Sequence, residues 1–598
     1  MRYMLLFDVL AVALLATSCS PTEEAPYDKD TRVVCDNNCV CSKLNDNVQF
    51  VAAVVRNYVD EGGITSFSSA YVSGQNDTYT FTFSGRQTVR YSDVSYEAGA
   101  PALSIYQEKG EYYWAINGCG VPIGKDELLK VTNDTLYPMF EVADNGSWQY
   151  SVGGIDWRPV PEANVAVGAS PLRASLSPNG DFLVCSANDS LQLVVPTNYL
   201  HYTLKNDVPL QGFYKDIFLD AGLYLTTRST IPAATYLGYK LESVSCSKEA
   251  DTAWQNSVIG GSADDENGRL LYPDGQPRYK ILFVNGGNSR SHGQSLNPRC
   301  LQNMRTFVAS GGSYVGTCAG AFFASSGYDS ILDYPYYLHL WPGTMNHTGL
   351  ADSSTGLFVD PGSPLLKYYT FGNDHYVANV RHNKGGYPVT WPVGTELLAR
   401  YDCPALPSIH EKPAAWAYKK DDKTGRVVLE GSHPEEVTSG ERRDFTAAMI
   451  KYAGDGVGVT KIKGLLRNGE SRVMDGLTSG RGRINSKIGD RQYHHFAVYV
   501  PDGARKITFS VSSPVDCNMQ LTICNSTYAY QDKATYKTSE SGSIQSLNFE
   551  NLPSGLWYVA VRLLTTVTAG DTDKGQVYSG RTDVLNGVPY TVTVSWLP

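Results

Sequence analysis

The stretch SGGSYVGTCAGAFFASSGY, residues 310–328, places a cysteine between an apolar run and a segment of helical composition. The apolar run predicts a buried strand, and AGAFFAS predicts a helix that begins directly after Cys318. A chain that turns this sharply from strand to helix holds its corner residue in a strained backbone conformation, so the neighbouring residues must be small. That requirement is met by Gly316, Thr317, Ala319 and Gly320.

A cysteine at such a corner has the surroundings of a nucleophile. Its side chain projects from the carboxyl edge of the sheet, where ligand sites of α/β proteins form. The N-terminus of the following helix favours negative charge and therefore the thiolate form. The N–H of Ala319 has no acceptor within the helix and is able to point at a developing oxyanion. The alternative interpretation of Cys318 is a buried, inert cysteine.

The segments around this corner alternate between strand and helix patterns. DIFLDAG (216–222) and RYKILFVNGG (278–287) are apolar runs that end in turns. NPRCLQNMRTFVASGG has Pro298 in its first turn and a glycine pair at its end, which predicts a helix between two strands. Strand–helix alternation of this kind predicts a parallel sheet covered by helices.

A partner base for the thiol is predicted in GRVVLEGSHPEEVTSGERRDFTAAMIKYAG, residues 425–454. Pro434 disfavours helix for the preceding residue and keeps the segment extended, and residues two apart in an extended segment point to the same side. We therefore predict that Glu435 orients the imidazole of His433, which takes the proton from Cys318. The alternative is a surface histidine with a charged neighbour.

GGSYVGTCAGAFF together with GRVVLEGSHPEE resembles the class I glutamine amidotransferase-like superfamily, with its Cys–His–Glu triad. VNGGNSRSHGQSLN and HNKGGYPVTWPVGTELLARYD (382–402) resemble most the domain called biotin-protein ligase N-terminal. The resemblance covers residues 206–457 and implies a flavodoxin-like parallel sheet with helices on both faces.

The same resemblance implies a role for each site residue. Cys318 is the nucleophile, His433 the base and Glu435 the residue that orients the base. The second oxyanion amide, beside that of Ala319, is supplied by Gly286 or Gly287.

Phe322 departs from the superfamily pattern. Glutamine-hydrolysing members usually have Gln four residues after the nucleophile, so a glutamine amide would lose a polar partner here. Neither a synthase domain that uses ammonia nor a biotin-ligase catalytic domain is recognisable, so biotin ligation is not expected. We predict a cysteine-dependent hydrolase or amidase that needs no cofactor and acts on an unknown small-molecule or peptide amide. The alternatives are a non-catalytic binding scaffold and a structural cell-envelope protein with Cys318 in a disulfide.

The first twenty residues, MRYMLLFDVLAVALLATSCS, predict export. A positive residue precedes an apolar run that is too short to span a bilayer. The segment resembles a bacterial lipoprotein signal, which implies a signal peptide over 1–18, a lipid on Cys19 and a polar tether over 19–48. The expected location is the cell envelope or the outer-membrane surface, with attachment by lipid only. Plain secretion without lipid is the alternative.

Two β modules are expected to flank the central domain. Residues 49–59 have helical spacing, and the rest of 49–197 has short aromatic strands with turns, which resemble a small β domain of surface lipoproteins. Residues 458–487 are Gly-rich and mostly basic, which predicts a linker. Residues 488–598 alternate between polar and apolar and predict a β-sandwich. It resembles the bacterial pre-peptidase C-terminal domain, an accessory module of secreted hydrolases.

Charge and cysteine usage exclude several functions. A net charge of −10 does not favour nucleic acid as a partner. CDNNCVC (35–41) has no second group of ligands nearby, so no metal site is expected. The 12 cysteines permit disulfides in an exported protein, but their pairing and the oligomeric state do not follow from the sequence.

Overall fold

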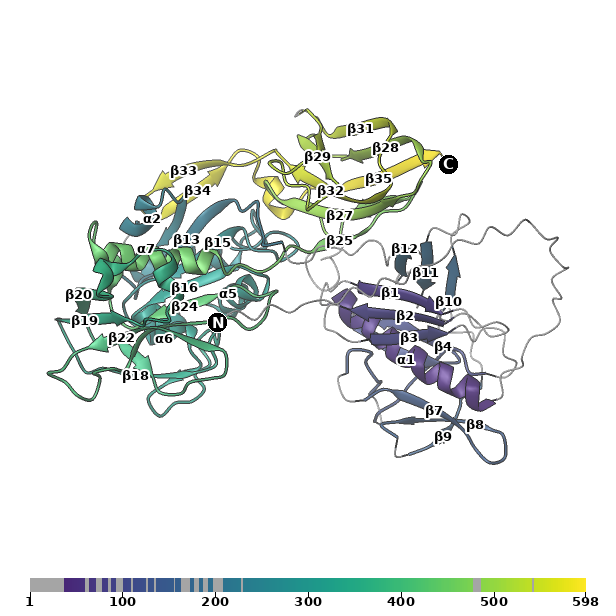
Figure 1. Cartoon of the computed structure of the whole chain (residues 1–598), viewed down its shortest axis with the longest axis horizontal. Coiled ribbons are helices and arrows are strands. Elements are labelled where there is room, and N and C mark those ends of the chain that lie inside the picture. Colours follow the sequence, from purple (N-terminus) through teal and green to yellow (C-terminus); the bar gives the residue numbers. More distant parts are fainter. Residues whose placement is uncertain are drawn as a thin grey trace, which may run out of the picture.

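The protein is a strand-rich, multidomain chain with one large mixed sheet and few helices (Figure 1). A computed structural model describes residues 37–59, 64–70, 78–83, 88–92, 100–108, 111–124, 127–133, 136–154, 156–162, 173–176, 182–186, 192–196, 208–226, 230–476, 485–539 and 542–597. Hereafter the N-terminal part is 37–196, the central part is 208–457 and the sandwich is 458–597. No helix among the described residues is both long and apolar enough to cross a bilayer.

The N-terminal part consists of one helix and four three-stranded sheets among its described residues. The sheets are antiparallel throughout. Their elements are α1 (Asn37–Val59), β1 (Ile64–Ala70), β2 (Thr78–Phe83), β3 (Thr88–Ser92), β4 (Leu103–Glu108), β5 (Glu111–Ile116), β6 (Cys119–Gly120), β7 (Pro138–Val142), β8 (Trp148–Val152), β9 (Arg158–Pro159), β10 (Arg173–Leu176), β11 (Phe182–Ser186) and β12 (Gln192–Pro196).

Helix α1 corrects the predicted tether. It begins at Asn37, twelve residues before the expected start at 49, so 37–48 is not a solvated segment. Val40, Leu44 and Val48 recur every four residues and are buried, which is the periodicity of a helix with one apolar face. The many polar residues between them hid this period in the sequence. Residues 1–36, with the predicted signal peptide and Cys19, lie outside the described residues.

The central part is built on an 11-stranded mixed sheet in the described chain. Five strands are parallel, in the spatial order β14-β13-β15-β16-β24, and the strands beyond β24 are antiparallel. The strands are β13 (Lys215–Ala221), β14 (Leu241–Ser245), β15 (Tyr279–Val284), β16 (Ser313–Thr317), β19 (Ser353–Val359), β20 (Tyr376–His382), β22 (Thr395–Asp402), β23 (Pro413–Tyr418), β24 (Val427–Glu430), β33 (Thr568–Thr572) and β34 (Gly575–Ser579). A small separate sheet holds β17 (Gly327–Tyr328), β18 (Thr344–His347) and β21 (Gly386–Pro388).

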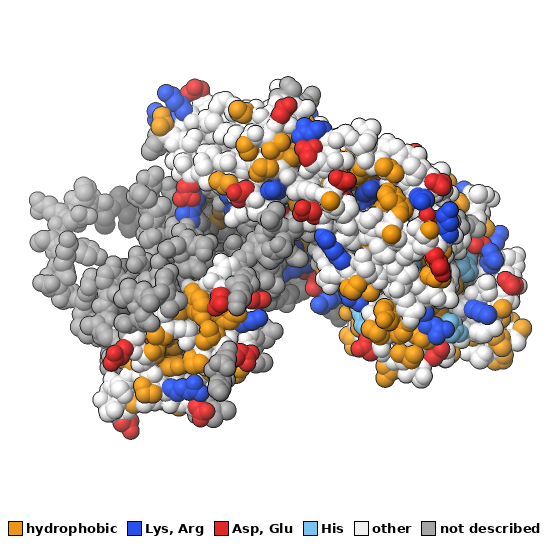
Figure 2. All heavy atoms as spheres, turned by 180° about the vertical axis from the view of Figure 1, so that it is seen from behind, with side chains coloured by type: hydrophobic (Ala, Val, Ile, Leu, Met, Phe, Trp, Pro, Cys, Tyr) orange, Lys and Arg blue, Asp and Glu red, His pale blue; other side chains and the backbone are white. Residues whose placement is uncertain are grey.

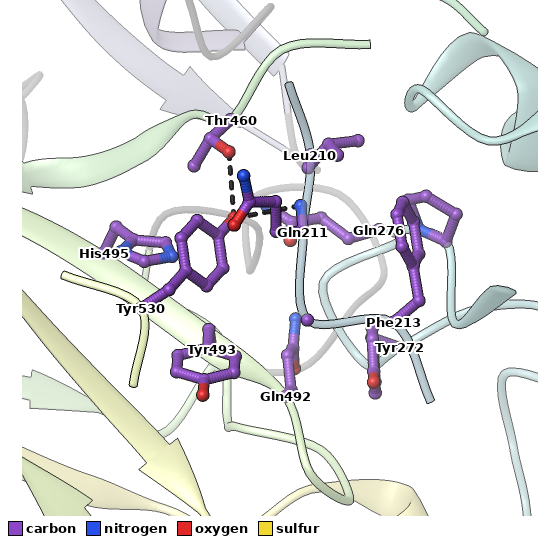
Figure 3. A pocket seen from close by; sticks show the side chains of 12 residues that line it. Leu210, Gln211, Phe213, Tyr272, Gln276, Thr460, Gln492, Tyr493, His495 and Tyr530 are labelled. Atoms are coloured by element: carbon purple, nitrogen blue, oxygen red, sulfur yellow. Dashed lines mark hydrogen bonds between the residues drawn. The ribbon is translucent and has the colours of Figure 1, made fainter. Parts of the chain in front are cut away.

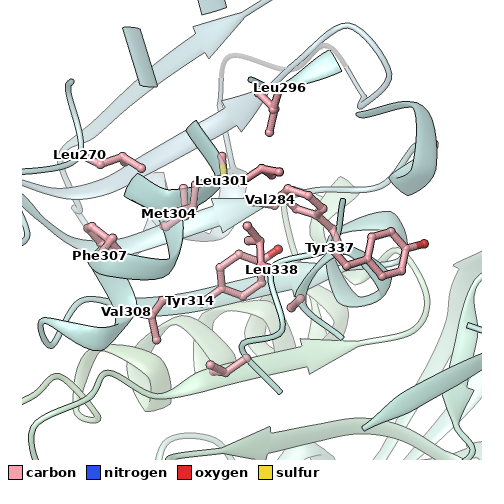
Figure 4. Close-up of a cluster of buried hydrophobic side chains, with 14 of the residues drawn as sticks. Leu270, Val284, Leu296, Leu301, Met304, Phe307, Val308, Tyr314, Tyr337 and Leu338 are labelled. Carbon is pink, nitrogen blue, oxygen red and sulfur yellow. The ribbon is translucent and has the colours of Figure 1, made fainter. Parts of the chain in front are cut away.

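Side chains of the parallel strands enter two hydrophobic cores. Leu282 and Tyr314 pack in one core with residues of α3 (Thr252–Gly260), α5 (Pro298–Ala309) and α6 (Ala319–Ala324). Figure 4 shows Tyr314 in this core with side chains of α5. Ile281 and Val315 pack in the other with α2 (Pro232–Tyr236) and α7 (Glu441–Gly454). Helix α4 (Ser289–Ser295) contacts α6. Successive strand residues therefore alternate between the two faces of the sheet, as a strand that is buried on both sides requires.

The sandwich contains a five-stranded and a four-stranded sheet in its described residues. The strands are β25 (Ile462–Leu465), β26 (Ser471–Met474), β27 (Tyr493–Val500), β28 (Arg505–Ser512), β29 (Met519–Cys524), β30 (Tyr536–Lys537), β31 (Ile544–Asn551), β32 (Gly555–Leu563) and β35 (Tyr590–Leu597). The predicted linker 458–487 is therefore partly wrong, because it contributes β25 and β26. Leu466 and Met474 are buried in the sandwich core, a role that the Gly-rich composition concealed.

The sandwich is joined to the central part by its chain and by buried charges. The hairpin β33–β34 leaves the sandwich, and β34 pairs with the edge strand β14. Tyr578 on β34 donates to the buried carboxylate of Glu242, which also contacts Arg269 at 2.5 Å. Lys463 lies 2.7 Å from Asp274, and Arg278 lies 3.4 Å from Asp490. We call this junction the seam.

A cavity of about 20 Å³ lies in the seam (Figure 3). Aromatic side chains of the sandwich, among them Tyr530, face the central-part residues Gln211 and Tyr272 across it. The Tyr530 hydroxyl accepts from the Gln211 N–H at 3.2 Å and bonds to the Thr460 hydroxyl at 2.9 Å. A space of this size fits a water molecule and no larger ligand. On the outer face drawn in Figure 2, acidic and basic side chains are interspersed over the described surface.

Candidate active site

Cys318 occupies the corner between β16 and α6 in a strained conformation, with φ 47° and ψ −105°. Its N–H donates to the Glu430 carbonyl at 2.8 Å, which ties the corner to β24. A Cβ on Gly320 would lie 1.9 Å from the Val284 carbonyl oxygen, and one on Gly316 would lie 2.6 Å from the Gly320 backbone. The prediction that residues beside this corner must be small is thereby confirmed.

His433 follows the end of β24 by three residues and lies beside Cys318. The Cys318 side chain acts on the pKa of His433, and the His433 Nδ1 lies 3.2 Å from Oε1 of Glu435. Because Nδ1 faces the carboxylate, Nε2 is the ring nitrogen left for the sulfur. The three residues are 4 %, 8 % and 5 % exposed, respectively. The structure thus brings together all three side chains that the sequence pairs.

The local conformation behind this meeting differs from the prediction. His433 has φ −127° and ψ 65°, and Pro434–Glu436 form a 3₁₀ turn instead of an extended segment. Proline at the first position of a turn needs no N–H acceptor, so it starts the turn at no cost in hydrogen bonds. The turn, and not the period of a strand, carries the Glu435 carboxylate back to the ring.

The electrostatics of the site favour a charged imidazole. Burial alone would lower the pKa of His433, but the hydrogen bonds with Cys318 and Glu435 and their charges outweigh burial and raise this pKa to about 11. An imidazolium beside the sulfur stabilises a thiolate. The arrangement is therefore suited to a nucleophilic sulfur and to donation of a proton from Nε2.

A second carboxyl, that of Glu430, lies near Glu435 and His433. It is fully buried at the end of β24, and burial raises its pKa to about 8, although hydrogen bonds from Ser432 act in the opposite direction. The nearby charge of Glu435 raises it further. At pH 7 this carboxyl is therefore largely protonated. Sequence reasoning missed Glu430, although a single acidic residue at the end of the apolar run VVLE was the available signal.

We expect Glu430→Gln to stabilise the protein near pH 7. When folding raises the pKa of an acid, the folded protein loses stability as the pH rises from the pKa in the unfolded chain, near 4.3, to the pKa in the folded protein, near 8. The amide does not ionise, so the variant should exceed the wild type by about 3–4 kcal/mol at pH 7 and by nothing near pH 4. Unfolding by urea at several pH values measures the difference. A gap that is constant with pH would contradict the raised pKa.

The segment Arg381–Gly386, here called the strap, crosses the site. The Arg381 carbonyl accepts the His433 N–H at 2.9 Å, and the Asn383 carbonyl oxygen lies 3.9 Å from the Cys318 sulfur. A Cβ on Gly385 would lie 1.7 Å from the Gly431 carbonyl oxygen, so only glycine allows this approach. The strap therefore covers the thiol and holds the backbone of the base.

The predicted oxyanion donors lie at the same sheet edge. Ala319 is the first residue of α6, where a helix leaves its N–H groups without intrahelical acceptors. Gly286 follows β15 and packs against the His433 ring, since a Cβ there would lie 2.0 Å from Cε1. Gly287 has φ +146° and packs against the Tyr224 carbonyl. Their assignment as oxyanion donors remains a prediction.

Phe322 is buried one helical turn after Cys318. Its ring lies 4.7 Å from the exposed ring of His347, and a Cβ on Gly386 would lie 2.6 Å from its Cζ. His347 Nδ1 lies 3.1 Å from the Lys384 carbonyl of the strap. The aromatic rings of Phe322 and His347 thus occupy the position at which glutamine-hydrolysing members of the superfamily usually have a glutamine side chain.

The other histidine and cysteine side chains considered as site residues show no arrangement for metal binding in the part of the chain that the structure describes. His292 is fully buried, pairs with Asp220 at 2.9 Å and has its ring edge-on to that of Phe323 on α6. The cysteine side chains that the structure describes are all free thiols, Cys318 included. The described residues hold no group of three or more side chains arranged to bind a metal ion.

One protein family matches the segment of the chain that contains Cys318. The family model "Biotin-protein ligase, N terminal" matches residues 273–331, which run from before β15 to past α6 and include Cys318. No curated protein sequence matches.

Solved structures resemble two parts of the chain at low identity. A putative GMP synthase subunit from Thermoplasma acidophilum is 14 % identical over 40 % of this chain and 95 % of its own, with a TM-score of 0.25. The pre-peptidase C-terminal domain of a collagenase from Bacillus anthracis is 14 % identical over 22 % of this chain and 90 % of its own, with a TM-score of 0.13. Because these TM-scores are low, the similarity to an amidotransferase-like fold rests on the family match and on the strand and helix arrangement.

Proposed function

We propose that the chain is an exported cysteine-dependent hydrolase or amidase of the class I glutamine amidotransferase-like superfamily. The observation that carries the proposal is the strained Cys318 at the strand–helix corner, with His433 beside it and the His433 Nδ1 3.2 Å from Glu435. The strand order β14-β13-β15-β16-β24, with core residues from helices on either face, supports a flavodoxin-like domain over 206–457.

The reaction follows from the placement of the groups. The Cys318 thiolate attacks the amide carbonyl, and the resulting oxyanion accepts N–H groups from Ala319 and from Gly286 or Gly287. His433 donates the proton on Nε2 to the leaving amine, so the C–N bond breaks and a thioester remains. Water then attacks the thioester with His433 as base, which releases a carboxylic acid and the free thiol.

The setting of this chemistry is the cell envelope. The N-terminal segment supports export, with lipid attachment at Cys19 or secretion without it. The substrate is therefore an amide outside the cytoplasm, either a small molecule or a peptide. The sandwich, similar to accessory modules of secreted hydrolases, supports an exported enzyme over a cytoplasmic synthase component.

A second candidate function is a non-catalytic surface binding protein that uses the same fold as a recognition scaffold. The burial of the thiol favours it, because Cys318 is only 4 % exposed under the strap and a substrate must displace that cover. In the enzyme the strap opens. In the scaffold it does not.

Labelling of Cys318 by a thiol-reactive electrophile separates the two functions. For the enzyme we expect the native protein to label at Cys318 about tenfold faster than a denatured control, and His433→Ala to remove that advantage. His292→Ala is not a matched control, because it removes a fully buried ring and unpairs the buried Asp220. His410→Ala serves instead, since the side chains of His410 and of its partner Asp402 are both more than a third exposed. Equal rates for the wild type and His433→Ala would favour the scaffold. A panel of small amides, γ-glutamyl compounds and peptides then defines the substrate, with Cys318→Ser as the blank.

A further inference from the structure

Glu430 touches both halves of the proposed site. Its backbone carbonyl accepts the Cys318 N–H at 2.8 Å. Its side chain accepts the Ser432 N–H at 2.7 Å, and the other carboxyl oxygen lies 2.5 Å from the Ser432 hydroxyl. One residue therefore contacts the nucleophile's corner through its main chain and the turn that leads into His433 through its side chain.

Backbone hydrogen bonds tie this turn to neighbouring segments, from the Gly431 N–H to the Ala414 carbonyl at 2.9 Å and from the His433 N–H to the Arg381 carbonyl at 2.9 Å. Gly431 has no side chain, and a Cβ there would lie 1.9 Å from the Gly386 carbonyl oxygen and 2.3 Å from the Tyr401 hydroxyl. The close approach of the strap thus requires glycine at 431, so the conformation between β24 and His433 depends on hydrogen bonds more than on packed side chains. Besides the backbone bonds, the Ser432 N–H and hydroxyl supply two bonds to the Glu430 carboxyl.

We propose that Glu430 is a positioning residue, which fixes the base relative to the nucleophile by holding the Glu430–His433 turn. The inference rests on the proposed function, whose triad it serves. Glu430 acts through Ser432 and the backbone, and takes no part in the bond changes at the substrate carbonyl.

The chemical form of Glu430 follows from its neighbours. The charged or titratable groups that face it are Glu435 and His433 on the turn and Tyr401 on β22. Burial keeps this carboxyl largely protonated at neutral pH. In that form its C=O accepts the Ser432 N–H, and its second oxygen stays paired with the Ser432 hydroxyl. A glutamine amide keeps both pairs, whereas alanine removes both.

The test compares Glu430→Gln, Glu430→Ala and Ser432→Ala with exposed Glu411→Gln as the control. One readout is the rate of Cys318 alkylation at pH 7. We expect Glu430→Gln and Glu411→Gln to stay within about twofold of the wild type, and Glu430→Ala to fall by about tenfold or more. Ser432→Ala, which keeps the backbone bond and removes no buried carboxyl, should lie between them and covers the case in which Glu430→Ala does not fold.

A second readout measures the base directly. In protein with ¹⁵N-labelled histidine, the His433 imidazole signal, assigned by its loss in His433→Ala, reports the hydrogen bonds of both ring nitrogens. We expect that signal to move in Glu430→Ala and Ser432→Ala and to stay in Glu430→Gln. Equal behaviour of the glutamine and alanine variants, or an unmoved signal in all three, would overturn the positioning role. Slow alkylation of the wild type would instead count against the proposed function and leave the imidazole result to decide the role of Glu430.

Discussion

Gly286→Ala is expected to reduce turnover as much as His433→Ala does, by about 10²–10⁴-fold, the range that a general acid–base contributes. The added methyl group would lie 2.0 Å from Cε1 and 2.7 Å from Nδ1 of His433, closer than van der Waals contact allows. Gly286 has no left-handed backbone conformation, so alanine adds bulk without backbone strain. The ring must therefore move away from Cys318, from Glu435 or from both.

The matched control is Gly362→Ala, where the new methyl group would lie 3.4 Å from Asp360 in ordinary contact. Turnover of whichever amide the panel identifies, and the rate of Cys318 alkylation, measure the effect. Because both substitutions disable the same imidazole, the double variant Gly286→Ala/His433→Ala should be no slower than either single variant. Additive losses, or a Gly286→Ala protein with full activity, would mean that the ring does not need its present position.

The corner of the site was predictable because its requirements are local. Small residues on both sides of Cys318 are a steric condition that the sequence displays directly, and Gly316 and Gly320 meet backbone atoms as expected. His433 does contact Glu435, as predicted, but the backbone that brings them together is a 3₁₀ turn and not the extended segment on which the prediction rested. Two residues that are close in sequence can be in contact in several backbone conformations. The predicted contact is therefore present although the predicted extended conformation was wrong.

Features that depend on distant segments were not predictable. The strap lies over the thiol because Gly385 and Gly386 approach Gly431, which is 45 residues or more away in sequence. The hairpin β33–β34 joins the sheet of the central part more than 320 residues after its partner strand β14. The pairing of β25 with β27 likewise gave no periodic signal in four residues. Such contacts depend on tertiary packing, and the hydrophobic pattern of a segment of a few residues is too short to predict them.

Asp274→Ala is expected to destabilise the protein by about 3–5 kcal/mol, since removal of one partner of a buried ion pair takes away the opposite charge that offsets the burial of the other. Asp274 lies before β15 in the central part, and its side chain is fully buried. Lys463 of β25 contacts it at 2.7 Å, and His494 of β27 approaches at 3.7 Å. With 4 % of its side chain exposed, Lys463 has no access to water that would solvate its charge in the variant.

The contrast is the exposed pair Lys130–Glu111, in which both side chains are 48 % exposed, so Glu111→Ala should cost under about 1 kcal/mol. Urea unfolding followed by tryptophan fluorescence measures both variants. A loss at Asp274 as small as that at Glu111 would show that water reaches the seam.

The same substitution tests whether the sandwich and the central part unfold together. The seam includes a β-sheet pairing, the Glu242 cluster and the Asp274 pair, so the two parts should unfold in one transition in the wild type. Burial raises the pKa of Asp274, but Lys463 and His494 outweigh it and hold this pKa below its usual range. Its stabilisation is therefore present above about pH 4 and is lost as the pH falls through the lowered value. We expect Asp274→Ala to split the transition in two at pH 7, and acid to diminish the difference between variant and wild type, because protonation of Asp274 removes the same charge that the substitution removes.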